Sequence, residues 1–104
     1  MTIAIANVTS TAANVYVSNG NTAITWMSLT NYSAGNVTAN VFVVPSGSSA
    51  SNLNAVLNQI EIAANDTYQI YSAGEKLLLS NGDAMVANAN VDNAVNAVTS
   101  YTSI

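Results

Sequence analysis

The stretch VTANVFV, residues 37–43, indicates the fold class of this chain. A valine or alanine stands at every odd position, with polar Thr38 and Asn40 at even positions between them. Because successive side chains of a strand point to opposite faces, this alternation predicts a β-strand with one apolar face. Shorter runs of the same kind are marked by Ile3 with Ile5, Val15 with Val17, Tyr68 with Ile70, Leu77 with Leu79, and Ala84 with Val86. We therefore expect an all-β protein, an antiparallel β-sandwich of about 8 strands and of the jelly-roll or immunoglobulin-like (Ig-like) kind.

Four turn signals separate these runs. Residues 18–21 read SNGN and residues 80–83 read SNGD, and Asn-Gly is typical of two-residue β-hairpins because both central residues take a positive φ. The second turn is predicted to join a strand at 77–79 to a strand at 84–86. Residues 32–35 and 71–74, both YSAG, are predicted turns of a second kind, each ending in glycine. The two kinds occur in opposite order in the two halves, so they do not indicate an internal repeat.

Two stretches are apolar without plain alternation. Residues 24–29 (ITWMSL) are apolar at both parities, which suits a central strand or a strand with a bulge, and Trp26 is expected in the core. Leu57 shares a face with Ile60 and Ile62 only if the register slips by one residue.

Other stretches fit a strand poorly. Residues 45–52 (PSGSSASN) are expected to form an exposed, mobile loop, because they are turn-forming and weakly hydrophobic. Residues 53–57 are expected to make about one helical turn after it. Residues 88–96 are rich in Ala and Asn and have too little bulk to predict burial, whereas residues 97–104 alternate well enough to close a sheet.

Most side chains that carry chemistry at neutral pH are absent. The 104 residues contain no His, no Cys and no Arg, and the formal net charge of −4 comes from five carboxylates and Lys76. Without a basic patch we expect neither a nucleic-acid partner nor an anionic membrane surface, and without Cys there is no disulfide or thiolate metal site. With charged residues at 6%, the solvent face must consist of neutral Asn, Ser and Thr. Such a surface repels other copies weakly, which indicates that it contacts protein.

Five segments, taken in order, resemble small virion structural proteins of tailed bacteriophages. They are residues 16–24 (YVSNGNTAI), 29–31 (LTN), 37–41 (VTANV), 60–67 (IEIAANDT) and 77–86 (LLLSNGDAMV). The resemblance covers roughly residues 15–104 and implies a β-sandwich on the outside of a phage particle, as a capsid decoration (cement) protein or a tail-associated protein. The near absence of charge departs from that family's pattern and leaves the binding surface open.

The carboxylates offer two chemical interpretations. Asp83 can ligate Ca²⁺ together with Asp66 or Asp92, because oxygen donors suit that ion. The chain has no Asp-x-Asp-x-Asp-Gly loop, however, and we favour a hairpin turn with a solvated Asp83. Glu61 and Glu75 can form a glycosidase pair, but Glu61 lies on the strand face opposite Ile60 and Ile62 and is expected to face solvent. Glu75 with Lys76 is expected to be a surface charge pair. No catalytic, cofactor-binding or metal-binding residue is predicted.

Recognition is expected to use aromatic and apolar side chains instead. Tyr32, Tyr71 and Tyr101 lie at turns or on polar parity, where a phenol can stack on a sugar or lie at a subunit interface. Residues 1–14 are predicted to be an edge strand or an arm that pairs with the sheet of a neighbouring subunit, and residues 15–104 to be the single sandwich domain. The predicted assembly interface consists of Ile3, Ile5, Val8, Tyr32 and Tyr71.

The expected function is that of a non-enzymatic capsid decoration protein that stabilises the phage head. A tail, neck or fibre-associated module with glycan binding is the alternative, and an enzyme is the third class. The expected partners are the major capsid protein or other virion proteins and further copies of the chain, a trimer being favoured. The expected location is the exterior of the virion after synthesis in the host cytoplasm, because residues 1–14 lack the basic and apolar regions of a signal peptide.

Overall fold

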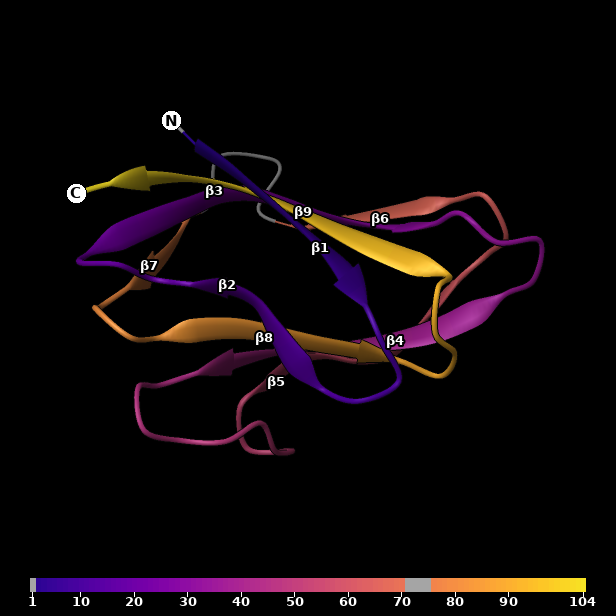
Figure 1. Ribbon diagram of the computed structural model, residues 1–104, viewed down its shortest axis with the longest axis horizontal. Helices are drawn as coiled ribbons and strands as arrows, with labels where there is room; N and C mark the ends of the chain where they lie inside the picture. Colours follow the sequence, from indigo (N-terminus) through magenta and orange to yellow (C-terminus); the bar gives the residue numbers. More distant parts are fainter. Residues whose placement is uncertain (1, 71–75) are drawn as a thin grey trace.

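The computed structural model describes residues 2–70 and 76–104, and these residues form two antiparallel β-sheets packed face to face (Figure 1). The strands are β1 (Thr2–Val8), β2 (Ala13–Val17), β3 (Thr22–Asn31), β4 (Val37–Val44), β5 (Ala55–Ile62), β6 (Thr67–Ile70), β7 (Leu77–Leu79), β8 (Ala84–Ala89) and β9 (Val95–Ser103). The prediction of an antiparallel β-sandwich is confirmed. Nowhere in the described ranges is there a helix long and apolar enough to cross a membrane.

The order of the strands identifies the kind of sandwich. One sheet has the order β1-β9-β3-β6, with β7 also paired to β3, and the other has the order β2-β8-β4-β5. The chain changes sheet at most of its connections, and β4–β5 is a connection within one sheet. With the short β7 set aside, this interleaved order is that of the eight-stranded jelly roll. It differs from the Ig-like order, in which the first two strands are neighbours in one sheet.

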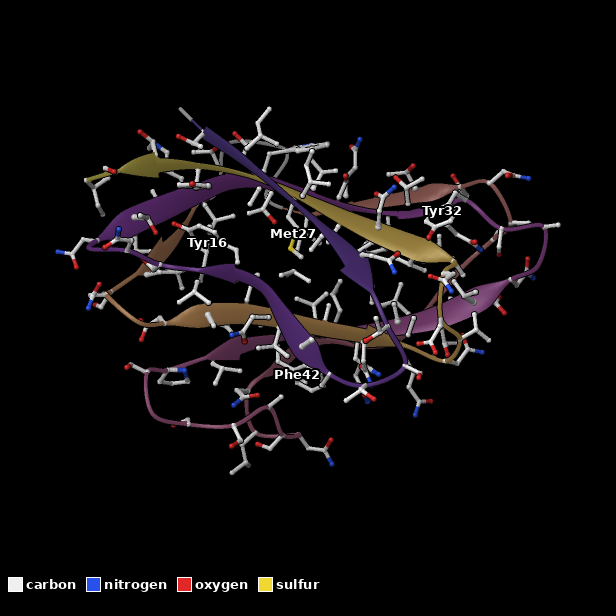
Figure 2. The ribbon with its side chains drawn as sticks, in the orientation of Figure 1. Tyr16, Met27, Tyr32 and Phe42 are labelled. Atoms are coloured by element: carbon white, nitrogen blue, oxygen red, sulfur yellow. The ribbon has the colours of Figure 1, made fainter. Side chains whose placement is uncertain are left out.

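A β-bulge in β3 decides which of its apolar side chains enter the core. The pairing of β3 with β9 shifts register between Ile24 and Trp26, and β3 lies inside the sheet. Both interpretations of its apolar pattern, a central strand and a bulge, therefore apply. The extra residue reverses the parity of the strand, so that Ile24, Met27 and Leu29 all point inward and are at most 1% exposed. Figure 2 shows Met27 between the two sheets. Trp26 is pushed to the opposite face and is only half-buried, so its expected place in the core is wrong.

Neither Asn-Gly sequence forms a hairpin, contrary to the prediction. Gly20 (φ +74°) and Gly82 (φ +87°) adopt the predicted positive φ, but Asn19 and Asn81 do not. The strands on either side of each turn nevertheless belong to different sheets: β2 and β3 flank the first turn, and β7 and β8 flank the second. A tight turn of this geometry therefore carries the chain between the two layers of the sandwich.

Two expectations near the ends of strands are also corrected. Residues 53–57 form no helical turn, because β5 begins at Ala55 after a turn in which Asn54 donates to the Ser49 carbonyl. Within residues 88–96, Ala89, Ala94 and Val95 are buried despite their small size. These residues are buried because they lie on the inward face, and the size of their side chains does not decide their burial. Residues 97–103 belong to strand β9, as their alternation predicted, and β9 lies between β1 and β3.

The four-stranded sheet carries a small second cluster on its outer side. Phe42, Val44 and Val86 pack there with Ala50 from the loop after β4, and Figure 2 shows Phe42 outside the interior of the sandwich. Most of this loop is exposed as predicted, and Leu53 is 98% exposed. The register slip expected in β5 is confirmed, with Gln59 at φ +52° between the paired residues.

Candidate interaction surface

The outer face of the five-stranded sheet is built without charge. None of its strands, β1, β3, β6, β7 and β9, contains Asp, Glu, Lys or Arg. Strand pleating sends alternate side chains of each strand to this face, where they meet solvent instead of the other sheet. A sheet face that would normally carry charged residues here carries only hydroxyl, amide and apolar groups.

Apolar side chains are interleaved with hydroxyls on this face. On β1, Ile3 is 65% exposed and Ile5 is 77% exposed. Ile3 lies opposite Ser100 of β9, which in turn lies opposite Trp26 of β3. In the next outward row Ile5 lies opposite Val98. We call the exposed side of this sheet the outer face and define it by Ile3, Ile5, Trp26, Leu78 and Val98.

The predicted interface residues do not all lie on one surface. Ile3 and Ile5 lie together on the outer face, but Val8 is 1% exposed and belongs to the core. The reason is parity, since Val8 is three residues from Ile5 and therefore points to the opposite side of β1. The inward positions between them are Ala4 and Ala6, which pack against the core. Tyr71 and the predicted turn at 71–74 lie outside the described residues.

Tyr32 lies at the other end of β1 from Ile3. Its side chain is 49% exposed, and its hydroxyl donates to Asn7 Oδ1 at 3.0 Å. Asn7 Nδ2 donates to Asn93 Oδ1 at 3.4 Å. The phenol is therefore held beside two amides at the edge of the sandwich, where Figure 2 labels it. Tyr101, by contrast, packs against the ring of Tyr16 with 4.3 Å between ring centroids.

The two Asn-Gly turns lie against each other at one end of the sandwich, and we call them the turn pair (residues 18–21 and 80–83). Ser18 N donates to the Asp83 carbonyl at 2.8 Å, and Gly82 N donates to the Ser18 carbonyl at 2.9 Å. Gly20 N donates to Asn81 Oδ1 at 2.8 Å. These bonds tie a connection near the start of the chain to one near its end, and so fix how the two sheets are joined.

The Asp83 side chain is partly exposed, as expected, and its carboxylate also braces the turn pair. It accepts hydrogen bonds from Ser46 N and Ser80 N, both at 2.9 Å. The bond from Ser46, followed by that from Ser80, lowers the pKa of Asp83, because both favour the charged form. At the other end of β8, Asp92 accepts from Ser10 N, and this bond lowers the pKa of Asp92 in the same way.

The carboxylates are not gathered into a site. Asp83 precedes β8 and Asp92 follows it, so the strand holds these two candidate Ca²⁺ ligands apart. Across residues 2–70 and 76–104, no cluster of three or more His, Cys, Asp or Glu side chains is placed to hold a metal ion. Glu61 is exposed on β5. Glu75, its candidate glycosidase partner and the expected charge-pair partner of Lys76, lies outside the described residues.

Asn31 is a structural residue that no sequence pattern indicated. Its side chain is fully buried at the end of β3, and Nδ2 donates to the carbonyls of Gly35, Ile62 and Ala63 at 2.8, 3.0 and 3.2 Å. Its Oδ1 accepts from the amide and the hydroxyl of Ser33. The amide thus joins the turn after β3 to the end of β5. Its burial also excludes it as a glycosylation acceptor, although Asn31-Tyr32-Ser33 matches that motif.

Comparison with known proteins yields no relative. No protein-family model matches the chain, and no curated protein or solved structure matches it either. Function must therefore be argued from the surface itself.

Proposed function

We propose that this chain is a non-enzymatic structural protein of a tailed-phage virion, a capsid decoration protein that binds the exterior of the head through the outer face. The observation that carries this proposal is the absence of charge from all strands of the five-stranded sheet, together with exposed Ile3 and Ile5. Docking a neutral face of this kind removes apolar surface from water without stripping water from ions.

Three further considerations support this role. The jelly roll recurs in viral capsid domains and in lectins, an association at the level of fold alone. His and Cys, which many enzymes use for proton transfer and nucleophilic attack, are missing from the sequence. A protein that bridges capsid subunits stabilises the assembled shell by mass action, because it binds the assembled state and not the free subunits.

The deciding experiment is cryo-electron microscopy of the native particle, which gives the position and copy number of the chain. We expect density on the outside of the head, with the β1/β9/β3 side against the major capsid protein. Binding of the purified protein to undecorated heads should be lost in Ile5→Lys and retained in Leu53→Lys, which places the same charge on an exposed apolar residue outside the outer face. Absence from the particle, or equal loss in both variants, would overturn the proposal.

Tyr32 supports the alternative, a tail, neck or fibre-associated module that binds glycans. An exposed aromatic ring fixed beside amide groups is a typical sugar-stacking platform, and Tyr32 is fixed by its bond to Asn7. A glycan array with the native protein, Tyr32→Ala and Tyr68→Ala tests this role. Binding lost only in Tyr32→Ala, with density on the tail, would replace the decoration role.

A further inference from the structure

The two sheets have four exposed edges, and three of them are protected against pairing with other strands. Natural sheets protect edges with short strands, bulges or charged residues. On the side of β3 away from β9, β6 has four residues and β7 has three. Edge strand β2 is interrupted by a register shift between Asn14 and Tyr16. Edge strand β5 has two register shifts in its pairing with β4 and carries Glu61.

The fourth edge, β1, has none of these protections. It pairs with β9 over seven consecutive residues without a register shift. Its sequence, TIAIANV, contains no charged residue, no proline and no glycine. Among the residues that the structure describes, β9 is the only strand paired with β1. The other side of β1 is therefore a regular, neutral strand edge open to another strand.

We infer that β1 pairs antiparallel with β1 of a second copy about a two-fold axis at Ile5. In this register Ile5 faces its own counterpart, Ile3 faces Asn7, and Ala4 faces Ala6. Every cross-strand pair is neutral, so no like-charge repulsion opposes it. The small inward residues Ala4 and Ala6, which are half-buried in one copy, are covered by the second. Strand β1 can therefore pair with β1 of a second copy, because each residue then faces a neutral residue of suitable size at the same distance from Ile5 on the other side.

The pairing has a definite consequence for assembly. The five-stranded sheets of the two copies join through β1 into one continuous sheet. Their two outer faces then lie side by side on the same side of this sheet. A contact of this kind uses the same patch on both copies and closes at two, so it favours a dimer over the trimer expected from sequence. This inference goes beyond the proposed function, since the dimer requires no capsid.

The native chain contains no cysteine, so single-cysteine variants report the register directly. Under mild oxidation Ile5→Cys should form a disulfide dimer rapidly, because residues directly opposite have Cβ atoms about 4.5–5.5 Å apart. Ile3→Cys alone should form no disulfide dimer, because Ile3 does not face its own counterpart. A mixture of Ile3→Cys and Asn7→Cys should form a mixed disulfide dimer. Leu53→Cys is the control for random collision, being more exposed than Ile5. Equal crosslinking of Leu53→Cys and Ile5→Cys would overturn the register.

Sedimentation equilibrium tests the dimer in solution without crosslinking. The native protein should show a concentration-dependent dimer, and Ile5→Lys should weaken it by about tenfold or more, because like charges then face each other across the axis. Mixing Ile5→Lys with Ile5→Glu should restore it, which a merely unfolded variant cannot do. A native protein that stays monomeric at hundreds of micromolar, or an Ile5→Lys dimer of native strength, would refute the inference.

Discussion

Asn31 shows how much of this fold depends on one buried amide. Five hydrogen bonds use both donor protons and the acceptor oxygen of its side chain. A buried polar group costs little while it is fully paired, and removing its partners exposes the full desolvation penalty. The network therefore specifies the geometry of the turn after β3 more strictly than an apolar residue would.

Asn31→Asp should destabilise the protein strongly, although it changes few atoms. A carboxylate oxygen would replace Nδ2 and face three carbonyl oxygens, so we expect a loss of about 3 kcal/mol or more in the free energy of unfolding. Urea denaturation measures the loss. Asn36→Asp, at an exposed position of the following turn, is the matched control and should cost far less.

Thr99→Val should have the opposite effect. Thr99 is fully buried on the inward face of β9, and its Oγ1 has no hydrogen-bond partner within the described residues. Valine keeps the shape and removes the unpaired hydroxyl, so the free energy of unfolding should rise by about 1 kcal/mol. Thermal unfolding checks this, with Thr102→Val on the half-exposed outward side of β9 as control. A lower melting temperature for Thr99→Val would contradict the expectation.

At the scale of the strands, local alternation predicted most of the elements but not their partners. The pattern at 37–43 and its shorter counterparts marked strands because burial of one face depends on period two alone. The bulge in β3 placed Trp26 outside, since one inserted residue changes the parity of everything after it. The Asn-Gly turns were predicted with the correct φ at glycine only and with the wrong role, because a glycine with positive φ serves both in a hairpin and in a crossing between sheets. Pairing across sheets depends on residues far apart, such as Ser18 with Gly82, which no local pattern reveals.

The exposure of the predicted interface residues was foreseen only in part, because exposure depends on strand parity. Ile3 and Ile5 are exposed as an interface requires, whereas Val8 was grouped with them by composition and is separated from them by parity. Asn31 and the bracing role of Asp83 were missed, because their partners are backbone groups in distant loops.

The turn pair gives a matched test of two glycines. Gly20 and Gly82 both have positive φ, so Ala should cost about 1 kcal/mol at either from strain alone. A Cβ on Gly82 would also approach Ser46 Oγ to 2.6 Å, while one on Gly20 would meet nothing within 4 Å. Gly82→Ala should therefore lower the melting temperature more than Gly20→Ala, and Ser46→Ala should recover part of the difference. Equal losses in melting temperature for the two variants would show that the loop containing Ser46 can move to accommodate the added Cβ.

At the scale of the whole molecule, the two braced carboxylates should make stability depend on pH in the acid range. The pKa values of Asp83 and Asp92 are lowered in the folded protein. Their contribution is therefore fully present above the ordinary Asp pKa of about 4 and is lost as the pH falls through the lower folded values. Melting temperatures of the native protein should drop over this acid range.

The variant Asp83→Asn/Asp92→Asn should flatten that drop while lowering stability at pH 7. Glu61→Gln, which removes one exposed carboxylate from β5, is the control for the loss of negative charge alone. A native profile that is already flat below pH 4 would rule out the bracing role.

The turn pair also affects the chemical stability of the protein. Asn-Gly sequences age by deamidation: the glycine nitrogen attacks the Asn Cγ, ammonia leaves, and water opens the resulting succinimide to Asp or isoAsp. Here both attacking nitrogens are occupied, that of Gly20 by Asn81 Oδ1 and that of Gly82 by the Ser18 carbonyl. Each turn thus protects the other from deamidation, and deamidation requires local opening of the turn pair.

Mass spectrometry after prolonged incubation at mildly alkaline pH should find both sites far slower in the native protein than in urea. Asn81→Ala frees the nitrogen of Gly20 and should speed the loss of Asn19. Asn19→Ala should leave Asn81 unaffected, because the nitrogen of Gly82 is held by a main-chain carbonyl. If that asymmetry holds, the protein owes part of its chemical lifetime to two turns, about 60 residues apart in the sequence, that occupy each other's reactive nitrogens.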